Sequence, residues 1–178
     1  MVLLQQVQKE FRQVEAGRSQ ASMDKVLWKG GKREGLIERT LVFIKPEAVI
    51  RGLMGGIISR IERRGLTIAA MKLLQPTRVQ AENIYEVHKG KSFYESLVEH
   101  IASGPILAMI VEGPNVVSFV RNMIGSTDPL EARPGTIRGD FALDVQKNII
   151  HASDSLENAG KEIPIFFKPD EILDYRKR

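Results

Sequence analysis

The chain of 178 residues is long enough for one domain with a full hydrophobic core and a short appendage, and its 43% hydrophobic and 27% charged residues are ordinary for a globular protein. It has no cysteine, which excludes disulfides and thiolate metal sites, and no apolar run reaches the roughly 20 residues that span a bilayer. The net charge of +4 favours anionic ligands, although the basic residues are scattered. We expect a cytoplasmic protein without membrane association.

The first 37 residues differ in character from the rest of the chain. Residues 1–18 have a loose helical periodicity, and residues 17–35 are rich in glycine, serine and charge, as in a linker. Polar side chains from Gln5 to Glu10 interrupt any apolar stretch, which counts against a signal peptide. We therefore expect an extension of unknown role over residues 1–37 and one folded domain over residues 38–178.

Regular elements begin after Glu38. Residues 40–44 form a short apolar run that predicts a buried strand, and Lys45-Pro46 ends it. Apolar residues at helical spacing over 57–61 predict a helix, which Gly65 ends. The next elements in the chain are a predicted strand over 66–74, helices over 78–87 and 93–101, a strand over 106–111, and a helix that Pro114 opens and Gly125 ends.

The last third of the chain begins with a stretch that has no clear period. Residues 126–147 predict a long structureless loop, and such loops in compact domains are usually functional. Asp154, with Glu157 three residues on, predicts the start of a helix through a capping box. Residues 163–167 predict a final strand. The order of elements indicates an α+β fold in which helices cover a sheet of about four strands.

The segment from Asn148 to Ser155 places His151 at the end of an apolar run and directly before a helix-start signal. A neutral imidazole is a nucleophile, and a helix N-terminus favours phosphate. The spacing therefore suggests a histidine that attacks a phosphoryl group. Taken alone, the segment favours a simpler interpretation, a histidine packed at a strand end.

Cationic side chains in particular contexts favour the phosphoryl hypothesis. Each of them alone is more typical of a solvated side chain, but with Thr127, Asn148 and His151 they would supply donors for a polyphosphate. These cations are Lys45, Arg121, Arg133 and Arg138. The sequence contains neither common glycine-rich phosphate-binding motif.

No metal-ligand motif is present in the sequence. His88 and His100 have no cluster of acidic residues nearby, and we interpret both as surface histidines. Mg²⁺ carried in by nucleotide phosphates fits the composition better than a metal held by the protein.

The chain closely resembles nucleoside diphosphate kinases, from about Glu38 to Arg178. Three segments carry the resemblance: Lys45-Pro46-Glu47, the run Pro-Gly-Thr-Ile-Arg-Gly-Asp-Phe from Pro134 to Phe141, and the run from Asn148 to Ser155. The resemblance implies a ferredoxin-like α/β sandwich with a four-stranded antiparallel sheet. It also implies ping-pong transfer of the γ-phosphate of a nucleoside triphosphate to a nucleoside diphosphate, which maintains triphosphate pools.

The same resemblance implies roles for individual residues. His151 would become the phosphohistidine, with Glu162 and Ser153 orienting its ring and assisting at the transferring group. Lys45 would serve both catalysis and binding. The other residues implied to contact the nucleotide are Tyr85, Phe93, Leu97, Arg121, Thr127, Arg138 and Asn148.

By resemblance the protein is a homo-oligomer, with a hexamer favoured and a tetramer possible. Two alternatives to an active kinase stay open. One is a sheet that binds single-stranded nucleic acid, although the chain lacks the aromatic Lys/Arg-Gly-Phe motif of RNA-recognition sheets. The other is a structural or regulatory relative that uses only the oligomer. Nucleic acid is not required for the kinase interpretation.

Overall fold

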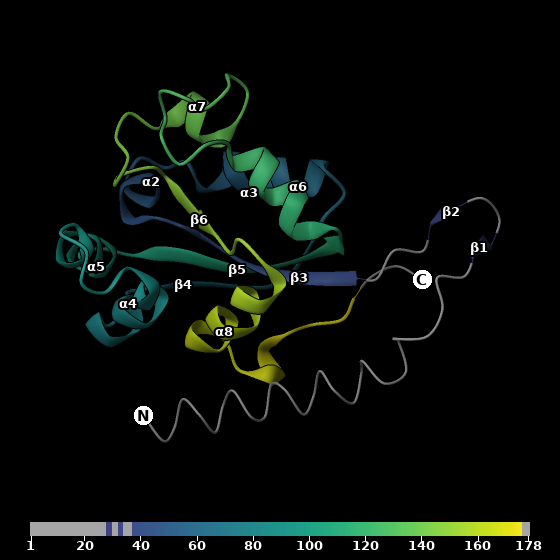
Figure 1. Ribbon diagram of the computed structural model, residues 1–178. Coiled ribbons are helices and arrows are strands. Elements are labelled where there is room, and N and C mark those ends of the chain that lie inside the picture. The colour runs from purple at the N-terminus through teal and green to yellow at the C-terminus, as the bar shows by residue number, and fades with distance from the viewer. Residues whose placement is uncertain (1–27, 30–31, 34–36, 176–178) are drawn as a thin grey trace.

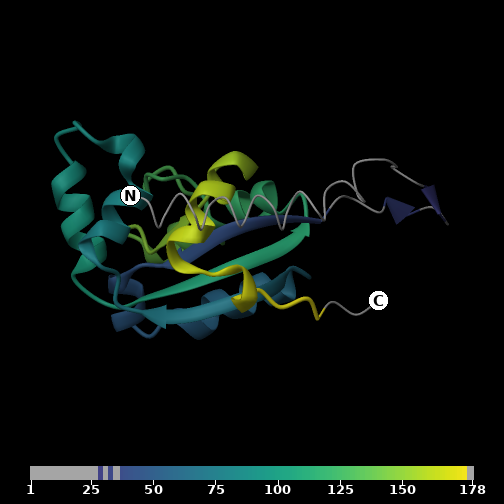
Figure 2. The ribbon, with the colours of Figure 1, turned by 90° about the horizontal axis from the view of Figure 1, so that it is seen from below.

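The computed structural model describes residues 28–29, 32–33 and 37–175. Within residues 37–175, four strands form an antiparallel sheet in the order β4-β5-β3-β6, and helices lie on both of its faces (Figures 1 and 2). The strands are β3 (Ile37–Ile44), β4 (Thr67–Leu74), β5 (Ile106–Pro114) and β6 (Ile150–Ala152). The helices are α2 (Pro46–Ile50), α3 (Met54–Arg63), α4 (Arg78–Ile84), α5 (Tyr94–Ala102), α6 (Val116–Ile124), α7 (Ile137–Phe141) and α8 (Leu156–Phe166), with 3₁₀ turns at Glu86–His88 and Pro169–Glu171.

Strand β3 is one of the two inner strands, and its side chains enter the hydrophobic cores on both faces of the sheet. Leu41 and Phe43 point to the face covered by α4, α5 and α8, whereas Val42 and Ile44 point to the face covered by α2, α3, α6 and α7. Side chains alternate across a strand, so a run that is apolar at every position is buried on both faces. This two-faced sheet with its strand order confirms the expected ferredoxin-like α+β fold.

Local sequence explains where several elements begin and end. Strand β3 stops at Lys45 because Pro46 occupies the first turn of α2, where its missing N–H costs nothing. Helix α3 is followed by Gly65, whose φ of +83° is a left-handed conformation that glycine adopts without strain. The predicted strands over 40–44, 66–74 and 106–111 and the helices predicted between residues 57 and 125 are confirmed to within a few residues.

The fourth strand differs from the prediction. Residues 163–167 do not form a strand, because Ile163 to Phe166 lie in the last turns of α8, and the fourth strand is β6. A short apolar run fits a buried helix as well as a strand, so its period alone does not separate the two. The N-cap of α8 is Ser155, whose hydroxyl accepts from the Asn158 N–H, whereas the Asp154 carboxylate accepts from the Asn158 side chain.

Three further predictions need correction. Pro114 is the last residue of β5, and α6 begins at Val116 after Asn115, which has a φ of 50°. Residues 126–147 are not structureless, because they contain α7, which the Thr136 hydroxyl caps by accepting from the Gly139 N–H. The predicted linker contains β1 (Trp28–Lys29) and β2 (Lys32–Arg33), which pair antiparallel. The segment with loose helical periodicity, residues 1–18, lies outside the described residues.

None of the helices in the part of the chain that the structure describes combines the length and the apolar character needed to cross a bilayer. Helices lie on both faces of the sheet in residues 37–175, although Met71 and Leu73 of the edge strand β4 stay exposed. Nucleic-acid-binding sheets present aromatic side chains on an open face. Phe43 is the one phenylalanine, tyrosine or tryptophan in strands β3 to β6, and it is fully buried, which counts against the nucleic-acid alternative.

Candidate active site

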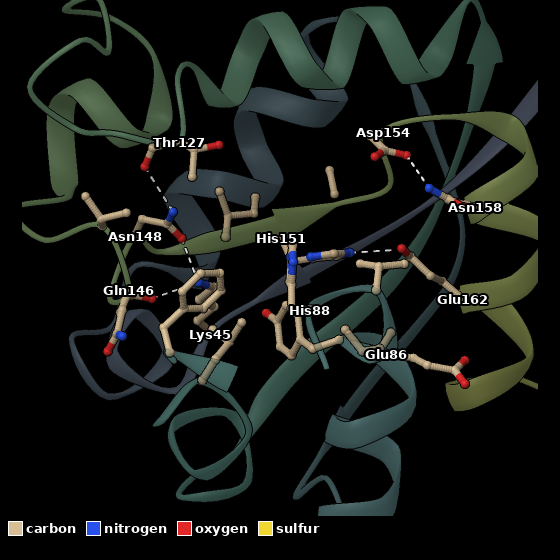
Figure 3. Close-up of a pocket in the computed structure, with 18 of the residues that line it drawn as sticks. Lys45, Glu86, His88, Thr127, Gln146, Asn148, His151, Asp154, Asn158 and Glu162 are labelled. Atoms are coloured by element: carbon tan, nitrogen blue, oxygen red, sulfur yellow. Dashed lines mark hydrogen bonds and ion pairs between the residues drawn. The ribbon is translucent and has the colours of Figure 1, made fainter. Parts of the chain in front are cut away.

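A pocket of about 610 Å³ opens beside β6 and gathers most of the residues selected from the sequence (Figure 3). Its volume lies within the range typical of small-molecule sites. The α4–α5 region, α6, the loop before β6, β6 itself and α8 all contribute to its wall. The predicted residues that line it are Lys45, Tyr85, Phe93, Leu97, Arg121, Thr127, Arg138, Asn148, His151 and Glu162.

His151 lies in the middle of β6, where it pairs with Phe43 of β3. Its ring stacks on the Phe43 ring at 4.6 Å between centroids, with 13° between the planes, and the Tyr85 ring meets it edge-on at 5.9 Å. The side chain keeps 18% of its surface exposed, on the pocket side. Two aromatic rings therefore fix the plane of the imidazole while one part of it stays accessible.

The Glu162 carboxylate sets the rotation and the tautomer of this imidazole. His151 Nε2 lies 3.0 Å from Glu162 Oε2, and the Ser153 hydroxyl donates to the same oxygen at 2.7 Å. An ionised carboxylate only accepts hydrogen bonds, so Nε2 carries the proton and Nδ1 keeps a free lone pair. Ser153 is buried and lies outside the pocket wall, so it acts on Glu162 rather than on the pocket.

Lys45 is a buried cation in the pocket wall, with 4% of its surface exposed. Its Nζ donates to Asn148 Oδ1 at 2.6 Å and to the Gln146 carbonyl at 2.9 Å. Burial lowers the pKa of Lys45 to about 8, with a further lowering from Arg138 and opposing contributions from Glu47 and Asp144. The Asn148 amide also donates to the Thr127 carbonyl at 3.1 Å, which ties the long loop to this amine.

Arg138, at the start of α7, is the second buried cation. Its guanidinium donates to three backbone carbonyls: Gly125 at 3.1 Å, Asn148 at 3.3 Å and Ile150 at 2.8 Å. Burial, together with the nearby Arg121, lowers the pKa of Arg138 to about 10, so the side chain is cationic at neutral pH. A guanidinium has five N–H donors, which leaves two for a ligand in the pocket.

Aromatic and apolar side chains from α4 and α5 form the other wall of the pocket. Phe93 has 40% of its surface exposed, and Leu97 lies buried beside it in the wall. The buried Tyr85 hydroxyl has no hydrogen-bond partner among the described residues. Burial and the nearby carboxylates raise the pKa of Tyr85, so this hydroxyl is a protonated donor.

Some sequence interpretations of charged residues were wrong. Arg133 is exposed and does not reach the pocket wall. His88 lines the pocket, with its ring 6.1 Å from that of Tyr85, because residues three apart in a 3₁₀ turn lie on one face. His100 is not a surface histidine either, since its Nε2 pairs with Glu47 Oε2 at 2.8 Å.

The described residues contain no group of three or more His, Asp or Glu side chains that could hold a metal ion. The cationic donors of the pocket wall instead fit an anion such as a phosphate chain.

Comparisons with known proteins identify the family of the chain. The family model for nucleoside diphosphate kinase matches residues 38–172. A nucleoside diphosphate kinase from Thermosipho africanus is 59% identical over 139 residues, which cover 78% of this chain and 95% of that protein. One from Staphylothermus marinus is 59% identical over 138 residues, which cover 78% of this chain and 98% of that protein.

A solved structure of Aquifex aeolicus nucleoside diphosphate kinase has a TM-score of 0.75 and 42% identity, and the match covers 78% of this chain and all of that one. A structure of the Encephalitozoon cuniculi enzyme has a TM-score of 0.74 and 44% identity, with coverage of 75% of this chain and 91% of that one. The chain therefore belongs to the nucleoside diphosphate kinase family.

Proposed function

We propose that His151 is the nucleophile with which this nucleoside diphosphate kinase transfers the γ-phosphate of a nucleoside triphosphate to a nucleoside diphosphate. The observation that carries the proposal is an imidazole oriented by Glu162 in the wall of a pocket that also holds Lys45, Arg121 and Arg138. In the first half-reaction the Nδ1 lone pair forms a bond to the γ-phosphorus. The bond between that phosphorus and the bridging oxygen breaks, and the diphosphate leaves.

In the second half-reaction the steps run in reverse with another nucleotide. A terminal oxygen of the incoming diphosphate attacks the phosphorus on Nδ1, the nitrogen–phosphorus bond breaks, and a new triphosphate leaves. The Nε2 proton stays shared with Glu162, which stabilises the imidazole as it gains positive character in each transfer. Ser153 supports this carboxylate through its own hydrogen bond.

The cations and the Tyr85 hydroxyl supply charge and donors to the phosphates. One charge pair at about 4 Å contributes roughly 4 kcal/mol at an effective dielectric near 20, before desolvation. Several donors are thus needed to hold a triphosphate in line and to offset the charge of the transferring group. We assign Lys45 and Arg138 to the β- and γ-phosphates, Arg121 and Thr127 to the phosphate chain, and Asn148 with Lys45 to the sugar hydroxyls.

The nucleotide base would stack on Phe93, with Leu97 beside it. Stacking uses the π-face that every base has, which predicts weak base preference. Mg²⁺ would arrive with the nucleotide and would neutralise part of the charge of its phosphates. The cationic side chains of the pocket support this arrangement, because they complement phosphates, and the described residues offer no group of carboxylates that would hold the ion.

We further propose that residues 38–178 form the catalytic domain, which the match to residues 38–172 supports. A homo-oligomer, with a hexamer favoured over a tetramer, and a cytoplasmic location stay predictions. Measuring the mass of the protein in solution tests the first of these.

The catalytic proposal is tested by incubating the protein with γ-labelled ATP and Mg²⁺. We expect an acid-labile, base-stable phosphoprotein whose label passes to any added nucleoside diphosphate. The His151→Ala variant should take up no label. A wild-type protein that takes up no label, or undiminished label in His151→Ala, would refute the proposal.

A further inference from the structure

The backbone just before His151 contains a strained turn. Ile149 is fully buried and has a φ of +76°, which is rare for a β-branched residue. The Ile150 N–H donates to the Asn148 carbonyl at 2.9 Å, so these three residues form a γ-turn of the strained kind with positive φ at its centre. Such a conformation persists only where its surroundings hold it in place.

Hydrogen bonds from distant parts of the chain hold the three carbonyls of this turn and its central N–H. The Lys45 N–H donates to the Ile149 carbonyl at 2.9 Å. The Arg138 guanidinium donates to the carbonyls of Asn148 and Ile150. The Ile149 N–H donates to Glu47 Oε1 at 2.9 Å, so this carboxylate holds the central amide of the turn.

The Glu47 side chain is itself fixed from the opposite side. Its second oxygen, Oε2, pairs with His100 Nε2 of α5 at 2.8 Å, and both side chains are largely buried. Burial alone would raise the pKa of Glu47, but the hydrogen bonds from His100 and from the Ile149 N–H outweigh it and lower the pKa. The carboxylate is therefore ionised at neutral pH and accepts from both partners.

We propose that Glu47, held by His100, is a positioning residue for phosphoryl transfer: its bond to the Ile149 N–H fixes the γ-turn that aims His151 and Asn148 into the pocket. Neither Glu47 nor His100 lies in the pocket wall, so both act through the turn rather than on the nucleotide. A rotation of the backbone at Ile149 would move Asn148, which precedes it, relative to His151, which lies two residues after it. This inference rests on the proposed role of His151.

The turn matters for rate because phosphoryl transfer needs an in-line approach of Nδ1 to the phosphorus. A misplacement of about 1 Å at a reacting group can cost 100-fold in rate. The nucleotide itself is held mainly by the cations and by Phe93. Glu47 influences one of these cations through its charge, which raises the pKa of Lys45, and Glu47→Gln removes that charge as Glu47→Ala does. Loss of the bond from the Ile149 N–H to Glu47 should therefore slow the chemical step more than it weakens nucleotide binding.

The test compares Glu47→Ala with Glu47→Gln in the full chain. Gln keeps an oxygen that accepts from the Ile149 N–H and an amide that can donate to a neutral His100, whereas Ala keeps neither. We expect Glu47→Ala to form phosphohistidine about 100-fold more slowly than wild type in a single turnover. We expect Glu47→Gln to stay within about fivefold, the effect of one hydrogen bond. The exposed Glu99→Ala on α5 is the control for removal of a carboxylate.

Each variant is also measured for ADP affinity and melting temperature, with rates taken well below the melting temperature. A purely structural role would lower the melting temperature and leave the rate of the folded enzyme unchanged, which would overturn the inference. Equal losses in rate and in ADP affinity would overturn it too. If Glu47→Ala does not fold, Glu47→Asp replaces it, since the shorter side chain keeps the charge but withdraws from the turn. A wild-type rate in Glu47→Asp would then also overturn the inference.

His100→Leu provides a second, independent perturbation, because it leaves the Glu47 bond to the turn but removes the partner that fixes the carboxylate. We expect His100→Leu to slow phosphohistidine formation less than Glu47→Ala does. An unchanged rate would show that His100 does not help to position the turn. Failure of the proposed function is distinguishable, since it would appear as absent labelling at His151 in the wild type.

Discussion

Replacement of Arg138 by alanine tests the assignment of the phosphate site. The guanidinium is buried in the pocket wall, donates to three backbone carbonyls and retains two N–H donors for a ligand. Its removal therefore deletes a phosphate contact and, at the same time, the bonds that join α7 to the backbone before His151. The loss of the phosphate contact lowers kcat/KM, whereas the loss of the carbonyl bonds lowers the free energy of unfolding. Because two of these bonds also hold the turn before His151, their loss adds to the fall in kcat/KM, and the fall worked from the phosphate contact is a lower bound.

The magnitude of each loss follows from these contacts. A charge pair with a phosphate is worth roughly 4 kcal/mol before desolvation, and solvent in the open pocket reduces this to about 2–3 kcal/mol. That corresponds to a fall of about 100-fold in kcat/KM. The three carbonyls can be rehydrated from the pocket, so we expect a loss of about 2 kcal/mol in the free energy of unfolding. In a domain of this size that lowers Tm by roughly 4–8 °C.

The assay is steady-state phosphate transfer from ATP to a second nucleoside diphosphate, with thermal unfolding measured in parallel. Arg78→Ala is the matched control, since Arg78 is exposed and its partners among the described residues are the surface carboxylates Glu82 and Glu95. We expect kcat/KM of the control within about twofold of wild type, as for surface pairs. Similar, small effects of the two substitutions would show that the phosphate site is misplaced.

Three further predictions address the other parts of the site. Glu162→Gln should slow phosphohistidine formation about tenfold, the worth of one charge-assisted hydrogen bond, with little change in nucleotide affinity; an unchanged rate in single-turnover measurements would contradict it. Lys45 is cationic below its pKa of about 8 and neutral above it, so kcat/KM should fall as the pH rises through about 8. A fall in kcat/KM that is centred instead on the ordinary lysine pKa of 10.5 would contradict this. Phe93→Ala should raise KM about tenfold for all nucleotides alike, whereas a loss confined to one base would argue against stacking.

The sequence predicts elements well where local signals agree with burial. The apolar run that ends at Lys45-Pro46 predicts both strand β3 and the position of the buried Lys45 amine at its end. The strand predicted over residues 163–167 failed because its period does not separate a strand from a buried helix. Strand β6 is only three residues long, and it is a strand because it pairs with β3, a segment more than 100 residues earlier in the chain.

The site was predictable from motif resemblance rather than from spacing. Ser153 and Glu162 lie on different elements from the cations, and only the fold brings Glu162 to the His151 ring. Glu47 and His100 are 53 residues apart in the chain and lie on two helices, and no local sequence pattern predicts their pairing. His88 could have been found, because it lies three residues after Tyr85 in a tight turn.

We expect the phosphoryl group to reside on one imidazole, that of His151, after it leaves the first nucleotide and before it reaches the second. The most direct measurement locates the phosphate in the isolated phosphoenzyme by fragmentation of its peptides under mild alkaline conditions. We expect one phosphate per chain on His151, which disappears on addition of a nucleoside diphosphate as an equal amount of new triphosphate forms. Phosphate on another residue that is released equally fast, or transfer with no protein-bound phosphate, would contradict it.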